Sequence, residues 1–281
     1  MTDIFMEMLS YPFMMRAIVV GVLVALCSSL LGVSLVLKRY SMIGDGLSHV
    51  GFGALAIATA TNWAPLTVSI PLVLAAAFFL LRLSEDSRIK GDSAIALIST
   101  GSLAIGVMVI SMTSGMNIDV YNYMFGSILA INSTDVILSV ILSSVVLVLY
   151  LFFYSRIFAV TFDESFAKAT GINAGMYNML IALLTAVTIV LGMRLVGALL
   201  ISSLIVFPAI TSMRLFKSFR SVVISSAVTS VVTFLTGIMA SYIYATPAGA
   251  SVVTFNIILF FVFSFTGYAT RTNRVSESTY A

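Results

Sequence analysis

Long runs of uncharged, mostly apolar residues alternate with short charged connections along this chain. The runs cover residues 17–37, 46–81, 93–118, 136–155, 169–193, 195–213 and 221–270. A helix that crosses a membrane needs about 20 residues, so the runs 46–81 and 221–270 are each long enough for two helices. Each also contains a turn signal with proline, at residues 62–65 and 246–249. The pattern predicts an all-α, polytopic bundle of about eight to nine transmembrane spans.

Two places leave the course of the chain open. The runs 169–193 and 195–213 meet at residues 192–194, where the chain makes either a tight hairpin or a break in one path. Residues 121–129 are apolar but too short to cross a bilayer. Such a segment is typical of a re-entrant or interfacial stretch within the outer connection.

The basic residues indicate which connections face the cytoplasm. Lys and Arg gather at residues 38–39, 82–90, 156–168, 214–220 and 271–274, which are alternate connections. Arg16 and Arg194 are the exceptions. Cytoplasmic loops of membrane proteins carry the excess of Lys and Arg, so this set is expected inside, with the N-terminus outside and the C-terminus inside.

The composition supports a membrane protein and disfavours several other classes. Hydrophobic residues make up 60% and charged residues 9% of the 281 residues, against about 25% charged in soluble domains. We therefore expect one membrane domain, residues 1–281, surrounded by lipid. The net charge of +3 comes without the basic, aromatic-interleaved surface typical of nucleic-acid binding. The single Cys27 allows no disulfide within the chain and excludes a Cys-rich zinc motif.

Sequence motifs for catalysis are missing. The chain has no Gly-x-x-x-x-Gly-Lys-Ser/Thr phosphate loop, so it is not expected to hydrolyse ATP by that route. It also has no Gly-x-Ser-x-Gly or His-Glu-x-x-His motif. These absences favour a transport subunit over an enzyme.

Asp45 and His49 are the strongest candidates for chemistry. They lie four residues apart at the start of a predicted span, so on a helix they share one face and can grip the same ion. Carboxylate oxygen with imidazole nitrogen suits zinc or manganese. The alternative is structural, with Asp45 capping the helix and His49 bonded to a neighbour. Ionisable residues at membrane depth are costly, which favours the functional interpretation.

One chain supplies too few ligands for a complete site. Two Asp and two His, placed face to face by a two-fold dimer, would be enough for tetrahedral zinc. The site therefore predicts a functional homodimer. The small residues that follow, including Gly51 and Gly53, predict close helix packing.

A second candidate lies in the connection at residues 160–173. Asp163 and Glu164 open a short amphipathic stretch, Lys168 lies near its end, and Gly171 can adopt a left-handed cap. This order of charges complements a helix dipole. A solvated loop is the plain alternative.

Four segments, in order, resemble a known family, the membrane permeases of bacterial ABC importers of zinc, manganese and iron (ABC-3). Gly44 to His49 is similar to its Gly-Asp-x-x-Ser-His segment, and Phe125 to Leu129 to its outer-loop Phe-Gly-Ser-x-Leu. Asp163 to Gly171 resembles its cytoplasmic Asp-Glu-x-x-Ala-x-x-x-Gly element. Val196 to Ala209 is similar to its Gly-x-Leu-Leu and Pro-Ala pattern.

The resemblance implies a function and partners. Asp45 and His49 would line the metal path. A docking element that includes Asp163, Glu164, Phe166, Lys168 and Gly171 would contact a separate cytoplasmic ATPase. An extracytoplasmic metal-binding protein would deliver the cargo, Zn²⁺ or Mn²⁺, and no permanently bound cofactor is expected. The location implied is the bacterial plasma (inner) membrane.

Two departures from the family pattern bear on specificity. Relatives often carry an acidic residue shortly before the proline of residues 245–249, and this chain does not. Manganese and iron members often continue after the histidine with Ala-Val-Leu-Pro-Gly, whereas this chain has Val50 to Ala54. We therefore favour zinc. The alternatives are an importer of a metal chelate such as a siderophore or corrinoid, an ATP-independent secondary transporter with a proton relay at Asp45 and His49, an intramembrane enzyme, and a structural scaffold.

Overall fold

The computed structural model describes residues 8, 10–85, 91–113, 124–126, 132–198 and 200–279. The elements that it defines in these residues are helices. They are α2 (Pro12–Leu37), α3 (Ile43–Thr61), α4 (Pro65–Glu85), α5 (Gly91–Thr113), α7 (Ser133–Phe152), α8 (Tyr154–Phe162), α9 (Glu164–Ala169), α10 (Ala174–Val196), α11 (Ile201–Leu215), α12 (Phe219–Tyr244) and α13 (Ala248–Thr279). The all-α prediction is confirmed for this part of the chain.

Seven of these helices are long and apolar enough to cross a membrane, namely α2, α4, α5, α7, α10, α12 and α13. Helix α11, with 15 residues, is apolar but shorter. Helix α3 has 19 residues and carries Asp45 and His49, and it is not among the seven. Seven spans are therefore established by length and composition, and the total of about eight to nine stays a prediction.

The predicted turns divide the two longest runs as expected, and one predicted break is misplaced. Asn62 follows α3 in a left-handed conformation, and α4 begins at Pro65. A short connection likewise separates α12 from α13. In contrast, α10 continues through residues 192–194 and ends at Val196, and the chain breaks at Gly197, whose φ is 95°. Arg194 lies in the last turn of α10, where it forms an ion pair with Asp135.

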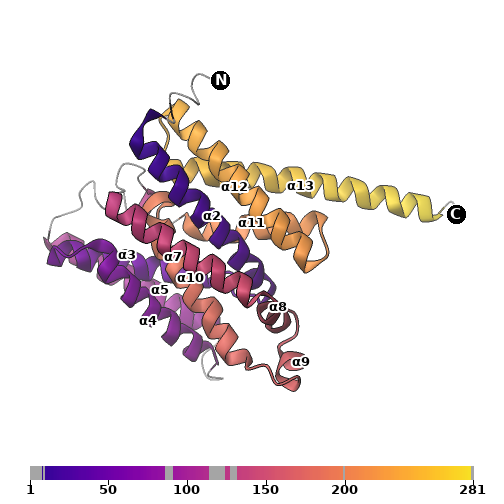
Figure 1. The fold of residues 1–281 in the computed structure, drawn as a ribbon, viewed down its shortest axis with the longest axis horizontal. Coiled ribbons are helices and arrows are strands. Elements are labelled where there is room, and N and C mark those ends of the chain that lie inside the picture. Colours follow the sequence, from indigo (N-terminus) through magenta and orange to yellow (C-terminus); the bar gives the residue numbers. More distant parts are fainter. Residues whose placement is uncertain are drawn as a thin grey trace.

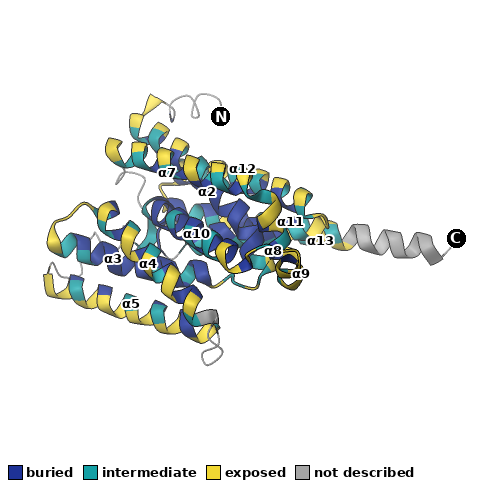
Figure 2. Ribbon diagram, turned by 60° about the horizontal axis from the view of Figure 1, so that its bottom comes forward, coloured by how far each residue is buried: buried dark blue, intermediate teal, exposed yellow. Residues whose placement is uncertain are grey.

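The core lies around α2 and α10. In the apolar 18-residue stretch of each helix, 67% of the residues are buried in α2 and 72% in α10, against 17% in α5 and 22% in α7. Figure 2 shows this contrast, with α2 and α10 mostly dark blue and α5 largely yellow. The outer helices expose large apolar side chains such as Leu97 and Val148, as expected where lipid is the solvent.

Helices α3, α4 and α5 pack together on one side of the bundle (Figure 1). Gly46 of α3 lies beside Ile95 of α5, and Gly53 lies beside Ser102. Gly46 and Gly53 are seven residues apart on α3, and their neighbours Ile95 and Ser102 are seven residues apart on α5. The two helices therefore run parallel in a constant register. A Cβ on Gly53 would lie 2.8 Å from the carbonyl oxygen of Ser102. The predicted close packing of this glycine-rich stretch is confirmed.

Candidate metal site and docking element

Asp45 and His49 occupy the first two turns of α3. The helix begins at Ile43, and Asp45 lies in its first turn without accepting a capping hydrogen bond. The capping role considered above is therefore not its role here. Ser48 instead donates its hydroxyl to the backbone carbonyl of Asp45, at 2.8 Å.

The two side chains face one another across one helical turn. Nε2 of His49 lies 3.7 Å from Oδ2 of Asp45, and their side chains are 12% and 36% exposed. Ligand atoms about 2.1 Å from a tetrahedral zinc ion are about 3.4 Å apart. The observed separation is close to that value, so the pair can hold two corners of one ion's coordination shell.

A single chain leaves the site half complete. Within the described residues there is no group of three or more His, Cys, Asp and Glu side chains that could hold a metal ion. Tetrahedral and octahedral sites need at least four ligands. Asp45 and His49 therefore form at most a half-site.

The half-site lies toward the predicted cytoplasmic end of the bundle. At about 1.5 Å per residue, Asp45 lies roughly 3 Å and His49 roughly 9 Å from the start of α3, which is about 28 Å long. Gly46, between them in sequence, packs against Leu80 near the end of α4 and Ile95 near the start of α5. The pair thus occupies the first third of α3, at the end predicted to be cytoplasmic, and not its middle.

The second predicted element forms a short capped helix, α9. Asp163 is its N-cap and accepts a hydrogen bond from the backbone N–H of Phe166, at 2.9 Å. Gly171 follows the helix with a φ of 83°, a left-handed conformation that glycine adopts without strain. Lys168 lies in the last turn and pairs with Glu164 at 2.9 Å. The helix and caps predicted for this stretch are confirmed.

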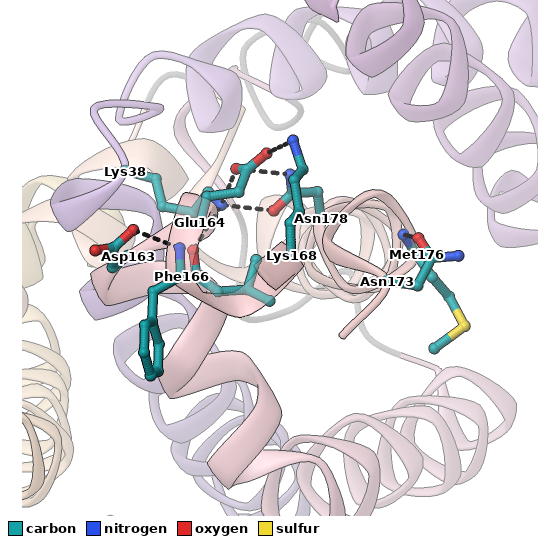
Figure 3. A network of polar contacts seen from close by, with 9 residues as sticks. Lys38, Asp163, Glu164, Phe166, Lys168, Asn173, Met176 and Asn178 are labelled. Atoms are coloured by element: carbon teal, nitrogen blue, oxygen red, sulfur yellow. Dashed lines mark hydrogen bonds and ion pairs between the residues drawn. The ribbon is translucent and has the colours of Figure 1, made fainter. Parts of the chain in front are cut away.

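Phe166 leaves an apolar side chain on the surface of this element. It is 64% exposed, and Figure 3 shows its ring directed away from the polar network around Glu164. The preceding helix α8 ends at Phe162, which is 78% exposed. Exposed aromatic side chains of this kind are typical of protein interfaces.

Lys38, which sequence reasoning counted as a topological charge, joins this element to α2. It follows the last residue of α2, and its side chain is only 8% exposed. Nζ donates to the backbone oxygen of Val160 at 3.1 Å, to Oε2 of Glu164 at 3.1 Å and to Oδ1 of Asn178 at 2.6 Å. Asn178 in turn donates to Glu164 at 3.2 Å. The dashed lines of Figure 3 follow this network.

Burial and pairing act in opposite directions on the charges of this network. Hydrogen bonds from Lys168, Asn178 and Lys38 outweigh desolvation and lower the pKa of Glu164 to about 2. Desolvation is the largest influence on Lys38 and lowers its pKa, although Glu164 opposes that shift. Position next to an apolar run does not distinguish Lys38 from an ordinary loop lysine, so the sequence held no signal for its role. Asn178, a polar residue inside the apolar run of residues 169–193, was not considered in the sequence analysis.

The opposite end of the bundle contains a second ion pair and a close backbone contact. Arg194 of α10 pairs with Asp135 in the first turn of α7, with side chains 12% and 18% exposed. Nearby, Gly126 and Gly197 both have positive φ. A Cβ on Gly197 would overlap the carbonyl oxygen of Met124. Glycine is thus required at the break after α10. Residues 127–129 of the outer-loop motif lie outside the described part of the chain.

Comparison with known proteins decides the family. A model of the ABC 3 transport family matches residues 10–267. The chain belongs to this family. The resemblance found in the motifs, to the membrane permeases of ABC metal importers, is thereby confirmed. The described residues include seven helices that are long and apolar enough to span a membrane, and this ABC 3 family member is a multi-pass protein of the bacterial inner membrane.

Relatives of the chain handle more than one metal. It is 30% identical over 250 residues to the high-affinity zinc uptake system membrane protein ZnuB of Haemophilus influenzae, covering 89% of this chain and 96% of that protein. It is 28% identical to the manganese transport system membrane protein MntC of Halalkalibacterium halodurans, covering 92% and 89%. The structure of PsaBC from Streptococcus pneumoniae in complex with Fab matches with a TM-score of 0.84 and 25% identity, covering 93% and 94%.

Proposed function

We propose that the chain is one half of a homodimeric permease that carries Zn²⁺, in preference to Mn²⁺, across the inner membrane. The observation that carries the proposal is the Asp45 and His49 pair, 3.7 Å apart on one face of α3. Two such half-sites, brought together by a two-fold axis, supply two carboxylates and two imidazoles. That donor set suits zinc and, with added oxygen ligands, manganese.

The family supports the remaining parts of the proposal. ATP hydrolysis belongs to separate cytoplasmic subunits, because the chain has no phosphate-binding loop of its own, and α9 with its exposed Phe166 is the surface on which they dock. An extracytoplasmic binding protein delivers the metal. ATP binding then moves the dimer between outward-facing and inward-facing states, and metal passes between the paired half-sites.

The choice between zinc and manganese is argued from the ligands and from the residues after His49. The relatives named above include a zinc and a manganese protein with almost equal identity. Zinc is favoured by the ligands, since two imidazoles and two carboxylates complete a tetrahedron without further groups. The residues after His49, Val50 to Ala54, also depart from the sequence often found in manganese and iron members.

The test is transport in liposomes that contain the permease with its ATPase. Radioactive Zn²⁺ and Mn²⁺ are supplied with the binding protein, with and without ATP. We expect ATP-dependent uptake of Zn²⁺ that excess Mn²⁺ inhibits weakly, and loss of uptake in His49→Gln and Asp45→Asn. Asp92→Asn is the matched control, because Asp92 is also an acidic residue in the first turn of a neighbouring, parallel helix. Uptake without ATP would favour a secondary transporter, and uptake of only a metal chelate would favour that class of importer.

A further inference from the structure

The side chain of Lys38 occupies a socket formed by three separate parts of the chain. Its acceptors come from α8, from α9 and from α10, at Val160, Glu164 and Asn178. An ammonium group has three N–H donors, and here each has one acceptor. A charge that is 8% exposed and fully hydrogen-bonded is held in one position.

Apolar contacts bind α9 to α8 and α10. Ala167 of α9 packs with Val160 of α8 and with Ala174 and Tyr177 of α10 in a small buried cluster. Helix α8 also packs on α2, and the ammonium of Lys38 adds an ionic link from the end of α2 to Glu164 of α9, across 126 residues of sequence. The docking element therefore has an ionic link to the helix that precedes the metal half-site.

A short, hydrogen-bonded turn connects Lys38 to Asp45. The backbone N–H of Tyr40 donates to Leu35, that of Ile43 donates to Tyr40, and that of Gly46 donates to Met42. The turn continues directly into α3, whose first turn carries Asp45. Lys38, Ile43 and Asn178 help to line one small cavity of about 10 Å³. Only residues 39–42 thus separate Lys38 from the start of α3.

We infer that Lys38 is a positioning residue that couples the docking element to the Asp45 and His49 half-site. The inference rests on the proposed function, in which a separate ATPase binds the docking element and α3 binds the transported metal. When the ATPase shifts α9, Glu164 and Asn178 pull Lys38, and the turn at residues 39–42 moves the first turn of α3. Lys38 touches neither metal nor ATPase and acts through these neighbours.

The test compares Lys38→Met with wild type in liposomes that contain the complete transporter. Lys217→Met is the matched control, because Lys217 is an exposed lysine on another of the connections predicted to be cytoplasmic. Coupling free energies between sites typically correspond to about 5–150-fold. We expect Lys38→Met to co-purify with the ATPase and to bind metal as wild type does, while metal transported per ATP hydrolysed falls at least about five-fold. An unchanged ratio would overturn the inference.

A double-mutant cycle separates a link from a general loss of stability. Lys38→Met and Glu164→Gln both break the Lys38–Glu164 pair, and Lys168→Met measures the loss from the other pair that Glu164→Gln breaks. Apart from that second loss, the double variant is expected to transport no less per ATP than Lys38→Met alone. Independent, additive losses would contradict the link. If Lys38→Met does not fold, Asn178→Leu and Glu164→Gln are measured in the same way, with the same ratio as the criterion.

If the wild-type transporter carries neither zinc nor manganese, the proposed function is refuted. A fluorescent probe of motion still tests the coupling through Lys38 in that case. Met42 is 56% exposed in the connecting turn, whereas the native Cys27 is buried, so a fluorophore on Met42→Cys reports the start of α3. ATP is expected to change its emission in the wild-type background and to leave it unchanged with Lys38→Met. An equal change in both backgrounds would show that the link carries no motion.

Discussion

Gly53 offers a test of how tightly α3 must pack to hold the half-site. It lies one turn after His49 on the same face of α3, and a Cβ there would lie 2.8 Å from the carbonyl oxygen of Ser102 in α5. Since the obstacle is backbone, Gly53→Ala must separate the two helices by about 0.6 Å to restore an ordinary contact. Overpacking of this kind costs about 1–3 kcal/mol.

Gly101→Ala is the control for Gly53→Ala. Gly101 is an exposed glycine on α5, and a Cβ there would meet nothing within 4 Å. Thermal unfolding in detergent is expected to lower the midpoint by several degrees for Gly53→Ala and not for Gly101→Ala. Metal affinity, measured by equilibrium dialysis, should fall for Gly53→Ala alone. Equal midpoints for the two variants would refute the argued packing of α3 on α5.

Three further predictions concern the surface and the ion pairs. Phe166→Ala should leave the fold intact and weaken ATPase binding about ten-fold or more, measured by co-purification, whereas Phe265→Ala, which alters an exposed position on α13, should not. Arg194→Met should destabilise the permease by about 3 kcal/mol in thermal unfolding, because Asp135 loses its partner, and adding Asp135→Asn should recover part of that loss. The pKa of Glu164 is lowered from 4.5 to about 2, so its stabilising effect is complete above pH 4.5 and is lost as pH falls toward 2. The fall in unfolding midpoint on acidification should therefore be smaller in Glu164→Gln.

Much of the fold was predictable because the bilayer imposes a simple pattern on the sequence. Runs without charge gave the helices, and the turn at Asn62 and Pro65 followed from local backbone chemistry. The break after α10 was misplaced because a charged residue was taken as the end of a helix. Arg194 instead lies inside the last turn of α10 and pairs with Asp135, which is distant in sequence. A single sequence does not reveal that partner.

The candidate site was predictable only as far as local spacing reaches. Four-residue spacing placed Asp45 and His49 on one face, and the charge order of residues 163–171 indicated a capped helix. Lys38 could not be recognised, because its role comes from a tertiary socket that brings α2, α9 and α10 together. The sequence predicted close helix packing at Gly53, but it did not identify Ser102 of α5 as the contact.

The central claim is that Asp45 and His49 form a half-site that a second copy completes. The most direct measurement is the amount of Zn²⁺ bound per chain by purified wild-type permease, determined by elemental analysis together with the mass of the complex in detergent. The account predicts a dimer with one tightly held Zn²⁺ for two chains, and loss of that ion in His49→Gln with the dimer intact. Tight Zn²⁺ binding by a monomer, or undiminished binding in His49→Gln, would contradict it.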